Sequence, residues 1–211
     1  MCAFKKQAFR RYFLLNLYVA GLIVSEIGRY VILAEHGYSS LQYRYFYYYS
    51  DAVLTIFLYF ALSTLYSHVF SEMKAEKYVQ FGTILLLAGT ALFSYSVVSQ
   101  ASAMLVTKFV VQLSQNLYFV GLVLTYVLWA AILKLRETRT RLIQIVLSLG
   151  VYFSLLAASY AIRSVYPPLS AYSIPLVQVF STFLPLAWAY AFWRLPEEAR
   201  LAPSRLAVIP R

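Results

Sequence analysis

Three charged residues stand inside long apolar stretches of this chain: Glu26, Arg29 and Asp51. A charged side chain near the centre of a bilayer costs about 2.5–3.5 kcal/mol on insertion scales, so such residues usually face a protein interior or water. Glu26 and Arg29 are three residues apart, which places them on one face of a helix where they can pair. Glu26 lies ~5 Å from the midpoint of its stretch, and Arg29 and Asp51 lie ~9 Å from theirs. The spacing predicts that Asp51 is a second partner of Arg29.

Amide side chains reach the same predicted layer from two further stretches. These residues are Gln112, Gln115, Asn116 and Gln178. One hypothesis is a hydrogen-bond network that clamps helices together, each link contributing about 0.6–2 kcal/mol. A second hypothesis is a ligand, ion or proton site formed by these amides with Glu26, Arg29 and Asp51. A third is a contact surface for a partner subunit.

Motifs for catalysis or metal binding are not found in the sequence. It holds two histidines and one cysteine, and it contains no HExxH, GxSxG, Walker A or GxGxxG pattern. His36 and His68 are predicted at opposite membrane faces, so they are not expected to share a metal ion or a haem. We therefore predict no catalytic residues, no metal site and no cofactor, and the sequence does not favour an enzyme.

Six apolar stretches must position the polar residues. They cover 12–34, 45–69, 78–99, 108–133, 142–163 and 171–193, and each holds at least about twenty residues, enough to cross a hydrocarbon core of ~30 Å. The chain is 62% hydrophobic and only 12% charged, whereas soluble domains carry roughly 25% charged residues. The predicted fold class is all-α: a six-transmembrane-helix bundle over 1–193, followed by a short cytoplasmic tail over 194–211.

Positive charge is distributed unequally between the two predicted ends of the bundle. Of the 18 Lys and Arg residues, 14 precede the first stretch or lie in the second loop, the fourth loop or the tail. The positive-inside rule then puts both termini in the cytoplasm and the polar layer in the outer half of a bacterial-type inner (plasma) membrane. Lys108 and Arg163 become basic residues at the outer mouth. The net charge of +10 belongs to membrane-facing loops, so we predict no nucleic-acid partner.

A run of tyrosines marks the outer side between residues 38 and 49, in the segment YRYFYYYSDAV and just before it. Tyrosine keeps its ring near the acyl chains and its hydroxyl in the headgroup layer, so an interfacial belt is one interpretation. The run is denser than a belt requires. An aromatic wall around an outward-facing pocket is the second interpretation.

Three functions compete on these observations. The first is a non-enzymatic subunit or sensor-like module that works with another membrane protein or by self-association. The second is a small-solute or proton-coupled transporter that uses Glu26, Arg29 and Asp51, with Pro185 as a kink in the last stretch. The third is a lipid-modifying enzyme. The absent motifs and short loops favour the first.

Overall fold

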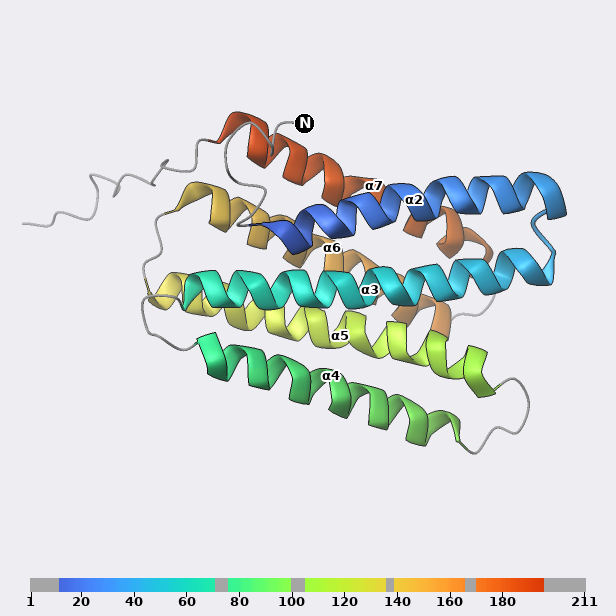
Figure 1. The fold of residues 1–211 in the computed structure, drawn as a ribbon, viewed down its shortest axis with the longest axis horizontal. Coiled ribbons are helices and arrows are strands. Elements are labelled where there is room, and N and C mark those ends of the chain that lie inside the picture. The colour runs from blue at the N-terminus through green and yellow to red at the C-terminus, as the bar shows by residue number, and fades with distance from the viewer. Residues whose placement is uncertain (1–11, 71–75, 100–104, 136–138, 166–169, 196–211) are drawn as a thin grey trace, which may run out of the picture.

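The computed structural model of the protein describes residues 12–70, 76–99, 105–135, 139–165 and 170–195, with no side chains described at 76 and 163–178. Within these ranges the fold is all-helical (Figure 1). Six helices are present: α2 (Phe13–His36), α3 (Leu41–Val69), α4 (Glu76–Val98), α5 (Leu105–Lys134), α6 (Thr140–Val165) and α7 (Ser170–Arg194). The predicted all-α, six-helix fold class is confirmed.

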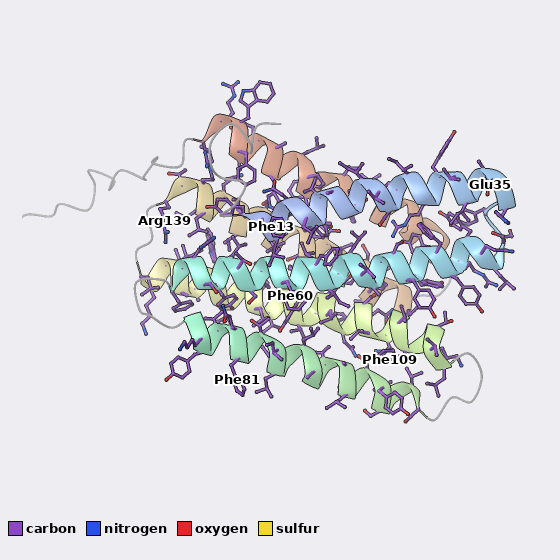
Figure 2. The ribbon with its side chains drawn as sticks, viewed as in Figure 1. Phe13, Glu35, Phe60, Phe81, Phe109 and Arg139 are labelled. Atoms are coloured by element: carbon purple, nitrogen blue, oxygen red, sulfur yellow. The ribbon has the colours of Figure 1, made fainter. Side chains whose placement is uncertain are left out.

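Five helices, α2 to α6, are long and apolar enough to cross a membrane. Large hydrophobic side chains cover their outer surface, as on α4, where Phe81 and Leu92 are exposed. Figure 2 shows Phe81 pointing away from the neighbouring helices. An exposed apolar surface of this extent suits a lipid environment and not water. The chain is therefore compatible with a multi-pass integral membrane protein.

The helix ends agree with the predicted spans to within four residues. The largest difference is at α3, which begins at Leu41 and not at residue 45. Ser40 caps this helix: its hydroxyl oxygen accepts a hydrogen bond from the backbone N–H of Tyr43 at 3.1 Å. A capping serine satisfies one of the open N–H groups of the first turn, so the helix extends through the tyrosine run.

Successive helices run antiparallel (Figure 1). Of the described basic residues, five therefore lie toward the end of the bundle where α2 begins and α7 ends: Lys77, Lys134, Arg139, Arg141 and Arg194. Glu35 and Arg139 mark the two opposite ends in Figure 2. Arg141 is buried at the basic end, where its Nε donates to the backbone oxygen of Leu195 at 2.9 Å. A cation at a helix C-terminus satisfies open carbonyls there. Which side of the membrane this end faces stays a prediction, as does the boundary at residue 194.

Five of the helices form a ring, and α4 lies outside it. Packing connects α2 to α3, α3 to α5, α5 to α6 and α6 to α7. Aromatic contacts close the ring between α7 and α2, where the rings of Tyr18 and Trp188 meet edge to face at 5.8 Å and those of Tyr12 and Phe192 at 5.4 Å. Helix α4 packs against α5 and, less extensively, α3. The interior of the ring is the enclosed part of the molecule.

Glycine permits a close approach between α2 and α3. A Cβ atom at Gly28 would come within 2.5 Å of the Phe46 ring, and one at Gly21 would lie 3.4 Å from Leu54. Apolar attraction between helices is weak in lipid, so small residues that let helices approach are a main source of packing energy. These two glycines bring α3 against the face of α2 that carries Glu26 and Arg29.

Candidate functional site

The charged pair predicted on α2 is formed. Arg29 Nη1 and Glu26 Oε1 are 2.8 Å apart, across one turn of the helix. The Arg29 side chain is 10% exposed and that of Glu26 is 41% exposed. The pair is thus anchored by an enclosed guanidinium, with its carboxylate at the edge of the helix packing. Opposite charges at this depth neutralise each other and lower the cost of the membrane environment.

The rest of the Arg29 guanidinium is held by α3. Its Nε and Nη2 donate to the Ser50 hydroxyl oxygen at 3.2 and 3.0 Å. Its central carbon lies 4.4 Å from the centre of the Tyr47 ring, a cation–π contact. Ser50 in turn donates to the backbone oxygen of Tyr47 at 3.0 Å. Among the described residues, Arg29 forms its one ion pair with Glu26, and its partner on α3 is Ser50 where the sequence predicted Asp51.

The Asp51 carboxylate instead faces hydroxyl groups. The Tyr118 hydroxyl on α5 donates to Asp51 Oδ1 at 3.0 Å. The hydroxyls of Ser114 and Tyr160 also lie beside this carboxylate. Ser114 is buried, 2% exposed. Asp51 is therefore a carboxylate inside the bundle that is surrounded by the hydroxyl groups of its neighbours.

A small cavity joins the Asp51 carboxylate to the charged pair. All five helices of the ring line it, and its polar lining includes Glu26, Arg29, Asp51, Tyr118, Tyr152 and Ser181. It leaves about 20 Å³ for the centres of water molecules. A space of this kind must offer roughly 10–15 Å³ to hold one water molecule. The cavity therefore has room for a species the size of water.

Aromatic side chains pack around the cavity. The hydroxyls of Tyr18 on α2 and Tyr152 on α6 are 3.2 Å apart. The Tyr118 and Tyr160 rings stack with their centres 5.5 Å apart, which fixes the hydroxyl that contacts Asp51. The site is thus built on rigid helices and packed rings.

The predicted amides form a separate group on the opposite face of α5. Gln112 Nε2 donates to Asn116 Oδ1 at 3.2 Å, and Asn116 Nδ2 donates to the Ser94 hydroxyl on α4 at 2.9 Å. Ser114 and Tyr118 are each two residues from Gln112 or Asn116, a rotation of about 200° on a helix. The structure therefore brings Glu26, Arg29 and Asp51 together and keeps Gln112 and Asn116 apart from them.

The remaining predicted site residues lie elsewhere. Gln115 is partly buried on α5. Lys108 is exposed and lines an open hollow with Tyr48 and Gln112 near the end of α5. The side chains of Arg163 and Gln178 lie outside the described residues. Among the residues that are described, no three His, Cys, Asp or Glu side chains come close enough to hold a metal ion.

The tyrosine run divides according to the helical period. Tyr43 is buried and Tyr47 lines the cavity, four residues apart on one face of α3. Tyr45 and Tyr49, also four apart, are exposed on another face. The run thus supplies residues suited to both predicted roles, an aromatic wall inside and a surface belt outside.

Four hydroxyl residues of the site were not predicted: Ser50, Thr55, Ser114 and Tyr118. Helical spacing held a signal for three of them. Thr55 follows Asp51 by four residues and donates to the Asp51 backbone oxygen at 2.7 Å, and Tyr118 follows Ser114 by four. Two polar positions at this spacing share a face of a helix. Ser50 carried no such signal, because its contact with Arg29 depends on how α3 is rotated against α2.

No protein-family model matches the chain, and no curated protein and no solved structure matches it at a significant level.

Proposed function

We propose that this protein is a non-enzymatic, sensor-like subunit of a membrane complex. The observation that carries the proposal is the cavity inside the ring, which has charged lining but room only for a species the size of water. Arg29, Glu26 and Asp51 are bound to one another or to neighbouring hydroxyls and ring faces. A charged cluster of this kind can respond to a change in its surroundings. It needs neither to transport a substrate nor to convert one.

The partner in this proposal is another membrane protein, bound on the α4 side. Gly82 and Gly89 on α4 have the seven-residue spacing of Gly21 and Gly28 on α2. The α2 glycines receive side chains of α3, whereas a Cβ atom at Gly82 or Gly89 would meet nothing within 4 Å. Small residues two turns apart let a neighbouring helix approach closely. The inner (plasma) membrane, with both termini inside, is part of the same proposal.

Purification of the full-length tagged protein in mild detergent, followed by native mass spectrometry, tests the proposal. We expect a second membrane protein at fixed stoichiometry, and we expect Gly89→Leu to release it. Ala20→Leu on α2, another small residue on an exposed surface, is the matched control and keeps the partner. A lone chain, a homodimer, or a partner that both variants retain equally would overturn it.

A proton-coupled transporter is the second candidate. The observation in its favour is that residues of five helices, including both carboxylates, line one cavity at membrane depth. In this case Glu26→Gln abolishes proton-driven uptake into proteoliposomes of the purified protein while the protein stays folded. Proton flux that is the same in the variant and the wild type excludes Glu26 as the coupling group.

A further inference from the structure

An open hollow lies between α3, α4 and α5, away from the cavity of the ring. It is at the end of the bundle where α3 begins, α4 ends and α5 begins (Figure 1). Its volume is about 420 Å³. Val97 and Val98 of α4 and Val111 of α5 give it apolar walls, and Lys108 is the charged residue among the described residues that line it. The hollow thus combines an apolar wall with a positive charge.

A second cation lies at the rim of this hollow. Arg44 on α3 precedes Tyr48, which lines the hollow, by four residues, so the two share one face of the helix. Arg44 is in the first turn of α3 and Lys108 in the first turn of α5. Both side chains are exposed. Two helices therefore bring a positive charge to the same end of the bundle.

These two cations are not neutralised by the chain. Among the described residues, neither Arg44 nor Lys108 forms an ion pair. The described carboxylates in this half of the molecule are those of Glu26, Glu35 and Asp51. Each has another partner, which is Arg29 for Glu26, His36 for Glu35 and the Tyr118 hydroxyl for Asp51. Two unpaired positive charges near the ends of membrane-spanning helices attract an anion.

The order of charge and apolar surface along the helices indicates which anion. Val111 lies one turn further into α5 than Lys108, so the apolar wall continues from the cation toward the middle of the bundle. A free phosphate ion would contact the cations and leave the valines uncovered. A phospholipid has its phosphate in the headgroup layer and its acyl chains deeper, which is the same order. We propose that this hollow binds one anionic phospholipid, with its phosphate between Arg44 and Lys108.

This inference goes beyond the proposed function, and either can fail without the other. Gly82 and Gly89, where we expect the partner protein, do not line the hollow. The isolated protein can bind the lipid whether or not it belongs to a complex. It can equally assemble with a partner when the hollow holds no anionic lipid.

Native mass spectrometry of the delipidated full-length protein in detergent tests the site by measuring the affinity for the first lipid bound. We expect phosphatidylglycerol to bind roughly tenfold more tightly than phosphatidylcholine with the same acyl chains. Arg44→Gln combined with Lys108→Gln should reduce this preference to about twofold or less. Lys77→Gln combined with Lys134→Gln removes two exposed lysines at the opposite end of the bundle. This matched control should keep the full preference.

Two further measurements separate the lipid from other anions. Val111→Phe narrows the hollow without changing its charge and should weaken phosphatidylglycerol binding roughly fivefold. Inorganic phosphate in excess should leave the lipid bound. Equal affinity for the two lipids would overturn the site, as would equal loss of preference in both double variants, because the net charge of the protein would then explain the binding. Unchanged binding by Val111→Phe, or displacement of the lipid by phosphate, would also overturn it.

Discussion

Helices α2 and α4 both flank the central helices, but only the glycines of α2 are packed against another described helix. Each carries two glycines seven residues apart. On α2 these glycines lie against α3, while on α4 they face open space. Each helix also makes polar contacts with the centre: the Arg29 guanidinium of α2 donates to Ser50 on α3, and Asn116 on α5 donates to Ser94 on α4.

The difference indicates which side of the molecule is packed by its own chain and which side we expect to bind a partner. Charges and glycines on α2 are matched by residues of the same chain, so that side is fixed by folding. The hydrogen bonds between α4 and α5 are neutral and stabilise this packing less than the charged contacts of α2 stabilise theirs. The two glycines of α4 also stay uncovered by described side chains. We infer that the α4 side is completed by another protein. Four sets of substitutions test this contrast.

The largest expected effect comes from breaking the charged pair. Arg29→Leu leaves Asp51 inside the bundle and Glu26 at its edge without a counter-charge, which should lower the free energy of unfolding by about 3–5 kcal/mol. Replacing both partners, Glu26→Gln with Arg29→Gln, should recover much of that loss. Unfolding in mixed micelles with increasing SDS measures both. If Arg29→Leu costs no more than the double variant, the pair is not a buried charge pair.

The glycines give the next effect. Gly28→Ala forces a methyl group against Phe46 and should cost about 1–3 kcal/mol of unfolding free energy. Gly82→Ala adds a methyl group in open space and should cost nothing, or stabilise the helix slightly because alanine has the higher helix propensity. The same SDS titration compares them. Equal losses at the two positions would show that α4 is packed as closely as α2.

The amide contact should matter less. Asn116→Ala removes the hydrogen bond to Ser94 on α4 and should cost about 0.6–1.7 kcal/mol, the range of interhelical hydrogen bonds in membranes. Gln115→Ala on the neighbouring position is the control, since no hydrogen bond from its side chain is found among the described residues, and it should change stability by less. A loss at Asn116 as large as that at Arg29 would remove the contrast between the two sides.

The smallest effect on folding is expected at the open surface of α4. Gly89→Leu fills space that this chain leaves empty, so the free energy of unfolding of the isolated protein should change by no more than about 0.5 kcal/mol. Its effect should appear in assembly with the partner. A strongly destabilised monomer would mean that the position is already packed.

Sequence patterns predicted the helices well because twenty or more apolar residues leave few alternatives in a bilayer. They also predicted the Glu26–Arg29 pair, which depends only on spacing within one helix. They did not predict that Ser50 takes the place of Asp51 at Arg29, nor that Gln112 and Asn116 face α4. Those contacts depend on how whole helices rotate against each other, and apolar surfaces in lipid do not specify that rotation.

Photocrosslinking in native membranes tests the central claim most directly. A photoreactive residue replaces Leu85, between the two glycines of α4, or Ile27 on α2; the two side chains are 61% and 60% exposed. The account predicts a crosslink to one defined membrane protein from position 85 and none from position 27. Crosslinks to no protein from position 85, or the same product from both positions, would contradict it.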